Sequence, residues 1–473
     1  MQNQSNQVQG SQKQYKFDQI LIRLSEMVIL QDKIDYLKHL FNNQKDLKEL
    51  VFDCNMQNIL FTIQKETMDN RICIFSKNQP CVSQLNQKKS MNVVSSILNY
   101  LSDAQSLENL KLQFEKWNMC GEEQVSDLTE KVRDILKVCQ LKQFTLNLSG
   151  WNSAPVTLIQ KITSILNDLQ RKKNIFYLDL DFSSWDKCTE LDIIQLGDSL
   201  INISLNCPIK TLRLNFSWWW HIQETGLNFI GKTLDKLNLS QTLKDEICIN
   251  LQHISKVQRN GFERLFNSFA EVKTSSFKLN MDYWQQLKDE DIIFLSQQIS
   301  KFARKNSNNL KNFSLIGSNW TQVTDKGMNY LLNSIREVLE QNIKCIESFQ
   351  INLSDSKIQN VETTKKVFSL LQILKQNEAI NLKLFIFNIS KWKMFDKESE
   401  IYKDIIQNLI QLFSNKMIIL IEFKGDCVLE SFMKEVKNCQ IYKQKIVLQY
   451  SIIQDKLQAY RKEILWDLIK VIK

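Results

Sequence analysis

A short pattern of alternating apolar and polar residues recurs along most of the chain. The segment at 212–219, "LRLNFSWW", has apolar residues at its first, third and fifth positions and polar residues between them. Similar segments begin at Leu110, Phe144 and Leu178, so four successive starts lie 34 residues apart. A period of two over five residues predicts a short strand with one buried face.

The pattern continues with less regular spacing toward the end of the chain. Seven further segments start at Ile247, Phe277, Phe313, Phe349, Phe385, Ile419 and Ile446, and we number the eight residues of every segment 1 to 8. Position 5 is apolar throughout, except at Gly317. Between the segments the apolar residues follow helical spacing, as at Leu227, Ile230 and Leu234. Each unit therefore predicts a strand, a loop, a helix and a short return.

One such unit cannot bury its own apolar face, whereas stacked neighbours can. We therefore expect an α/β solenoid, curved into a horseshoe or arc, with parallel strands on the concave face and helices on the convex face. The Gln/Asn-rich residues 1–15 predict a disordered tail. Residues 16–105 predict a helical N-terminal cap with degenerate repeats, in which 16–48 form one or two amphipathic helices. Residues 106–473 predict the solenoid proper, ending in a C-terminal capping helix.

The repeat units resemble leucine-rich repeats of the ribonuclease-inhibitor-like class. The resemblance is carried by "LRLNFSWWWHIQETGLNFIGKTL" from Leu212 and "FSLIGSNWTQVTDKGMNYLLNSI" from Phe313, each with an alternating strand, a turn and a helix start. Phe and Ile often replace Leu, and the Asn that the family buries in its turn is mostly missing. The resemblance implies an arc that presents its strands to a protein partner.

Tryptophan follows the repeat closely. Seven of the 10 tryptophans occupy position 8, namely Trp117, Trp151, Trp185, Trp219, Trp284, Trp320 and Trp392. This recurrence predicts that Trp219 packs inside the turn, stacked on its equivalents in neighbouring units. Trp218 and Trp220 exceed what the repeat requires, and they are therefore candidates for binding a partner.

Positions 2 and 4 point to the opposite face of the strands from the core. Position 4 is polar in nearly every unit, and its binding candidates are Asn147, Asp181, Asn215, Asn250, Asn280, Asn352 and Asn388. This row is either a recognition surface or a ladder of side chains that bond to one another. The candidates at position 2 are Arg213 and Lys278, followed by the apolar Ile386, Leu420 and Val447. The apolar end is either covered by the C-terminal helix or open to a partner.

Composition and sequence motifs reduce the number of function classes that fit the chain. The net charge of +9, from 61 Lys and Arg against 52 Asp and Glu, is spread along the chain, which argues against nucleic acid as the partner. Eleven cysteines without a CxxC pair and only 3 histidines predict no metal site. No catalytic or cofactor-binding motif is present. We therefore expect neither enzymatic activity nor a cofactor. No signal peptide or membrane-spanning run is recognisable, so the expected location is the cytoplasm.

These observations predict a non-enzymatic scaffold or a structural subunit of a larger intracellular assembly. Cytoskeletal and ciliary assemblies are the first candidates. The protein partner is expected on the concave strand face and at the apolar C-terminal end. Two alternatives stay open, a substrate-recognition subunit of a ubiquitin ligase and an RNA-binding module.

Overall fold

The computed structural model describes residues 105–376 apart from gaps at 117–120, 152–156, 186–187, 255–256 and 258. It also describes several strands and helical residues between 19 and 99, residues 381–389, Trp392 and a strand at 418–422. The chain divides into two compact units, residues 1–174 and 175–473, which we call the N-terminal and the C-terminal unit.

The N-terminal unit is a sheet with helices between its later strands. Its strands lie in the order β6-β5-β2-β1-β4-β3, and all the described pairs are parallel except the pair of β3 with β4. The elements are β1 Gln19–Arg23, β2 Glu49–Asp53, β3 Gln64–Lys65, β4 Arg71–Ile74, β5 Asn109–Gln113, α3 Glu122–Val138, β6 Gln143–Asn147 and α4 Thr157–Leu169.

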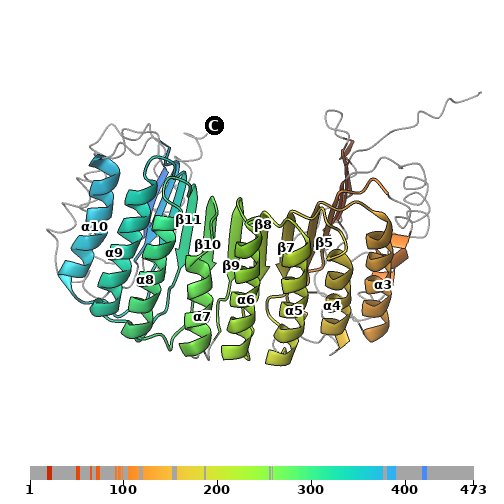
Figure 1. Cartoon of the computed structure of the whole chain (residues 1–473), viewed down its shortest axis with the longest axis horizontal. Helices are drawn as coiled ribbons and strands as arrows, with labels where there is room; N and C mark the ends of the chain where they lie inside the picture. The colour runs from red at the N-terminus through yellow and green to blue at the C-terminus, as the bar shows by residue number, and fades with distance from the viewer. Residues whose placement is uncertain are drawn as a thin grey trace, which may run out of the picture. The chain divides into compact units, whose positions relative to one another are not determined.

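The C-terminal unit alternates strand and helix from β7 to β13. Its strands β7 to β14 lie in chain order, and Figure 1 shows α5 to α10 in a row along one side of them. The first elements are β7 Tyr177–Asp181, α5 Glu190–Asn206, β8 Thr211–Asn215, α6 Glu224–Ser240, β9 Glu246–Asn250, α7 Arg259–Ala270 and β10 Ser276–Asn280. The remaining elements are α8 Asp289–Lys305, β11 Asn312–Ile316, α9 Asp325–Asn342, β12 Ser348–Asn352, α10 Val361–Gln376, β13 Leu384–Asn388 and β14 Ile418–Glu422.

The register of the strands follows the sequence repeat. Position 1 of each unit pairs with position 1 of the next in parallel, as Leu212 does with Ile247 and Phe277 with Phe313. The side chains at positions 1 and 3 are buried under the helices, and those at positions 2 and 4 are mostly partly exposed. Parallel strands alternating with helices in an open sheet confirm the predicted α/β solenoid class, and the sheet is not closed into a barrel in either unit.

Phenylalanine takes the place of leucine at position 1 for a packing reason. In β10 to β13 the four rings form one column, with centroids 5.7, 5.6 and 5.7 Å apart between successive strands. All four rings are buried, namely Phe277, Phe313, Phe349 and Phe385. Parallel strands bring identical side chains side by side, so stacked aromatic pairs form along the column.

The glycine at position 5 of the Phe313 unit has a steric cause. A Cβ added at Gly317 would lie 2.2 Å from the Trp320 ring, so any other residue would displace that ring. The single break in the apolar pattern at position 5 therefore occurs where the Trp320 ring occupies the space that a side chain at position 5 would need.

Acidic residues at the helix starts join successive units. Asp289, the first residue of α8, accepts hydrogen bonds from the backbone N–H groups of Thr324 and Gly327 at the start of α9, at 2.8 and 3.1 Å. Asp325 does the same for the backbone N–H groups of Gln359 and Asn360 before α10, at 3.1 Å each. A carboxylate near a helix N-terminus satisfies unpaired donors and interacts favourably with the helix dipole.

The prediction for the N-terminal end is wrong in one place. Residues 19–23 of the expected amphipathic helices form strand β1, which pairs in parallel with both β2 and β4. Two isoleucines in "QILIR" favour a strand. Pairing with a strand on each side outweighs the helical spacing of apolar residues over 16–48. The predicted tail at 1–15, the unit at Ile446 and the C-terminal capping helix lie outside the described residues.

Candidate functional site

The predicted binding residues lie on the strand face that carries no helices. Asn147 lies on β6 of the N-terminal unit, and Trp218 and Trp220 lie in the turn after β8. The other described candidates lie on β7 to β13 and are partly exposed, namely Asp181, Arg213, Asn215, Asn250, Lys278, Asn280, Asn352, Ile386 and Asn388. Leu420 lies in β14, where only the backbone is described, and Val447 lies outside the described residues.

The Asn and Asp side chains at position 4 have a structural role in the turn. In six units the side-chain oxygen accepts a hydrogen bond from the backbone N–H two residues later, at 2.9–3.2 Å. The acceptors are Asn147, Asp181, Asn215, Asn250, Asn280 and Asn352. This is an Asx turn, which ends the strand and begins the loop. One bond also crosses strands, from Asn215 Nδ2 to Asp181 Oδ2 at 2.9 Å.

The tryptophans at position 8 form a buried row behind the turns. Trp219 is 0% exposed, and its ring lies 5.9 Å from that of Trp185 in a stacked arrangement, as predicted. The indole N–H donates to the position-5 carbonyl of the preceding unit, at 2.5–3.0 Å. The donors of these bonds are Trp151, Trp219, Trp284, Trp320 and Trp392. The repeat tryptophan therefore satisfies a carbonyl that the strand ladder leaves free.

The flanking tryptophans are exposed and belong to an aromatic stack. Trp218 is 37% and Trp220 36% exposed, in contrast to the buried Trp219 between them. The Trp218 ring lies 3.6 Å from His253 at an angle of 22°, and His253 lies 3.9 Å from Tyr283 at 15°. Trp220 borders two of these rings, with its centroid 5.4 Å from Trp218 and 5.6 Å from His253. We call these four residues the aromatic stack.

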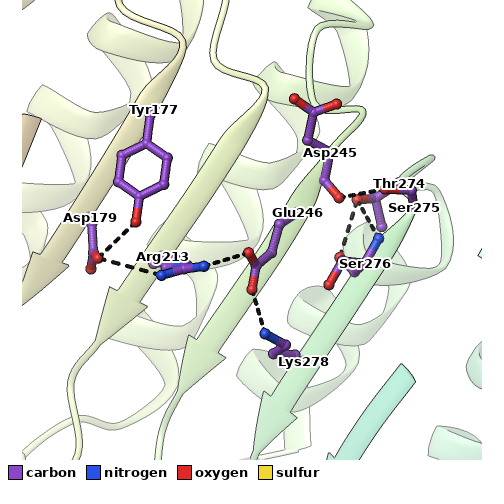
Figure 2. A network of polar contacts seen from close by, with 9 residues as sticks. All are labelled: Tyr177, Asp179, Arg213, Asp245, Glu246, Thr274, Ser275, Ser276 and Lys278. Atoms are coloured by element: carbon purple, nitrogen blue, oxygen red, sulfur yellow. Dashed lines mark hydrogen bonds and ion pairs between the residues drawn. The ribbon is translucent and has the colours of Figure 1, made fainter. Parts of the chain in front are cut away.

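A chain of ion pairs crosses the strand face from β7 to β10. Figure 2 shows Arg213 between two carboxylates, with its Nη2 2.7 Å from Glu246 Oε2 and its Nη1 3.9 Å from Asp179 Oδ2. Lys278 Nζ lies 2.8 Å from the other oxygen of Glu246. The Tyr177 hydroxyl donates to Asp179 at 3.1 Å, and its ring lies under the Arg213 guanidinium at 5.5 Å. We call these five residues the ionic row.

The surroundings shift the pKa values of Glu246 and Tyr177 in the ionic row. Burial alone would raise the pKa of Glu246, but the hydrogen bonds and positive charges of Lys278 and Arg213 outweigh it and hold that pKa below its usual range. Burial, reinforced by the negative charge of Asp179, raises the pKa of Tyr177 to about 12. The Tyr177 hydroxyl therefore stays protonated at pH 7 and donates a hydrogen bond to Asp179.

Burial also shifts the pKa values of a histidine and of cysteines among the described residues. Burial lowers the pKa of His253 below 6.5, against the opposing charge of Asp282, so its ring is neutral at pH 7. Burial raises the pKa of the Cys139 and Cys207 thiols to about 11, so both are protonated packing groups. Within the described residues, no three His, Cys, Asp or Glu side chains gather as a metal ion would require. No helix in that part of the chain is long and apolar enough to cross a bilayer.

The structure brings together residues that the repeat pattern alone did not single out. His253 and Tyr283 occupy position 7, as Trp218 does, so a comparison of position 7 across units would have found the stack. Glu246 and Tyr177 directly precede position 1, outside the numbered segment. Comparing the chain with protein-family models and with curated proteins gave no match in either case.

Proposed function

We propose that this protein is a non-enzymatic scaffold of the leucine-rich-repeat type that binds a protein partner on the strand face of its C-terminal unit. The observation that carries the proposal is this face itself. Across β7 to β13 the side chains at positions 2 and 4 are mostly partly exposed, and no described element of the unit covers them. A broad face built from a rigid sheet favours recognition of a folded surface over binding of a small substrate.

The chemistry of the face supports a protein partner. Charged groups alternate in sign along the ionic row, from Asp179 through Arg213 and Glu246 to Lys278. Alternating charges set specificity and orientation in protein interfaces, because a wrong partner meets like charges. We infer that the assembly is intracellular, with the cytoskeleton and the cilium as the first places to look.

The alternative of RNA binding has one feature in its favour, the exposed rings of the aromatic stack. A phosphate backbone also needs unpaired cations. Here Arg213 and Lys278 are held by Asp179 and Glu246. A protein partner therefore fits the face better than RNA does.

The proposal is tested by crosslinking and affinity purification of the tagged full chain from its native source. We expect one or more proteins in stoichiometric amounts, and a lone monomer would contradict the proposal. Ubiquitin-ligase subunits among the crosslinked proteins would instead identify the ligase alternative.

A pair of variants locates the partner. Gln350→Arg places a long charged side chain at position 2 of β12, and Tyr330→Arg places the same side chain on the outer surface of α9, where Tyr330 is 51% exposed. Partner recovery should fall with Gln350→Arg and persist with Tyr330→Arg. Equal recovery with both variants, at equal melting temperatures, would move the interface away from the strand face.

A further inference from the structure

The aromatic stack occupies backbone positions that disfavour large side chains. Position 7 has a positive φ in each of the eight units from Leu110 to Phe349, between 60° and 75°. Such a left-handed conformation is easiest for Gly and tolerable for Asn and Asp. In the other five units position 7 is Lys116, Gly150, Ser184, Asn319 or Asp355, and four of these five side chains are small. Trp218, His253 and Tyr283 are therefore not required by the turn, and their backbone positions would favour smaller residues.

The stack ends at Trp218 and at Tyr283, which are 37% and 36% exposed. His253 is covered on its two faces, by Trp218 and by Tyr283, so each outer ring has one face turned away from it. The next position-7 residues, Ser184 and Asn319, carry no ring that could continue the stack. The Asn319 side chain is instead bonded to a carboxylate, with its Nδ2 3.4 Å from Asp282 Oδ1. A flat group from another molecule could stack on Trp218 or on Tyr283.

The only charged residues in the strand ends and turns that carry the stack are acidic. Positions 4 to 8 of the five units from β7 to β11 contain two carboxylates, Asp181 and Asp282, and no Lys or Arg. Asp181 accepts from the backbone N–H of Ser183 and from Asn215, both neutral donors. Asp282 accepts from the side chains of Gln252, Ser318 and Asn319, which are neutral as well. Among the described residues no cation forms an ion pair with either carboxylate.

A flat, positively charged group satisfies both features. We propose that the aromatic stack binds an arginine side chain of the partner protein, with its guanidinium against an outer ring face and a carboxylate nearby. Asp282 directly precedes Tyr283, and Asp181 lies on the strand next to Trp218. Guanidinium stacks on Trp and Tyr and offers several N–H donors in its plane, whereas a lysine ammonium is compact and strongly hydrated. This proposal rests on the proposed function and names the group that the scaffold recognises.

The test uses the full chain and a library of randomised twelve-residue peptides. Peptides selected on the wild-type protein should be enriched in Arg over Lys. Replacing the Arg of a selected peptide with its neutral isostere citrulline should weaken binding by about tenfold, as expected for a partly desolvated cation–π contact. Selected peptides without Arg, or equal binding of the citrulline peptide, would overturn the proposal.

Two variants place the contact on the stack. Trp218→Asn and Tyr283→Asn introduce asparagine, which tolerates the left-handed backbone conformation. Both variants should therefore fold normally, and melting curves would verify this. The double variant should lose the Arg peptide, and Tyr330→Ala on α9 should retain it. Undiminished binding by the double variant would refute the assignment.

A fluorescent oligouridine distinguishes a nucleobase from an arginine. Binding of this probe to the wild-type protein, lost in the double variant, would assign the rings to bases and overturn the arginine proposal. The two proposals can also fail separately. If the native partner is lost with Gln350→Arg but retained by the double variant, the scaffold stands and the arginine proposal fails.

Discussion

Two stretches of the C-terminal unit share one backbone and differ in their surfaces. In β7 to β10 the strands carry five charged residues, Asp179, Asp181, Arg213, Glu246 and Lys278, whereas β11 to β13 carry none. We call them the charged segment and the neutral segment. Both have the same parallel register and the same backbone hydrogen bonds from the turn. In both, the residue at position 7 has a left-handed backbone conformation. The difference therefore lies in side chains alone.

The comparison separates what the repeat requires from what it leaves free. The buried Trp284 of the charged segment and Trp320 of the neutral segment both donate to the preceding unit, at 2.6 and 3.0 Å. At position 7, by contrast, the neutral segment has Asn319 and Asp355, and the charged segment has Trp218, His253 and Tyr283. A residue that raises the conformational free energy of the turn in one segment only is more informative about function than a residue that recurs in every unit.

The largest effect is expected at the required tryptophan. Trp219→Ala should destabilise the C-terminal unit by about 3–5 kcal/mol, because it opens a large cavity and leaves the Phe182 carbonyl without its donor. Urea unfolding followed by circular dichroism measures the change. If Trp219→Ala cost no more than Trp218→Asn, the distinction between buried and exposed tryptophans would carry no energetic meaning.

The next effect concerns the ionic row. Glu246→Gln should cost about 1–3 kcal/mol at neutral pH, because Arg213 and Lys278 then face an uncharged partner in a partly buried site. The reverse change in the neutral segment, Gln350→Glu, adds a charge at a partly exposed position and should have little effect on stability. Both are measured by urea unfolding.

The sign of the pH dependence follows from the lowered pKa of Glu246. The carboxylate stabilises the fold fully above its ordinary pKa, near 4.5, and that contribution is lost as the pH falls through the lowered value. Wild type and Glu246→Gln should therefore differ at neutral pH and converge in acid. A difference that stays constant down to about pH 3 would show that the ion pairs do not stabilise the charged segment.

A smaller effect is expected at the Asx turns. Asn250→Ala removes the acceptor for the Gln252 backbone N–H, which lies 3.1 Å away, and should cost about 1 kcal/mol. Asn250→Asp should cost much less, because Asp181 fulfils the same role in its own unit at 3.0 Å. If Asn250→Asp and Asn250→Ala were equally destabilising, the side-chain oxygen would not be the stabilising group. Thermal melting of the wild type, Asn250→Ala and Asn250→Asp measures these differences in stability.

The smallest effect on stability is expected at the aromatic stack. Trp218→Asn should leave the melting temperature within a few degrees of wild type, since the left-handed backbone at φ 66° suits Asn and the ring is partly exposed. A loss comparable to that of Trp219→Ala would mean that the stack supports the fold, and would remove the reason for assigning it to a partner.

The repeat made most of the fold predictable. Strands β5 to β14 and the helices α5, α6 and α9 follow from local alternation and helical spacing. The N-terminal strand β1 did not, because pairing with β2 and β4 decides its conformation and neither partner is local. The role of two buried polar residues could not be predicted from the sequence either. Asn306 and Asn342, each 0% exposed, bind backbone groups of the adjacent return loops, which sequence spacing does not reveal.

The sequence by itself determined the repeat unit and its period. It also distinguished Trp219, as a packing residue, from Trp218 and Trp220. Those features are local, because burial in a repeat follows from position in the repeat. Only the tertiary structure decided that Trp218, His253 and Tyr283 form one stack, and that Arg213 lies between Asp179 and Glu246. These residues are about 30 to 35 positions apart along the chain, and parallel strands at their close spacing bring them into contact.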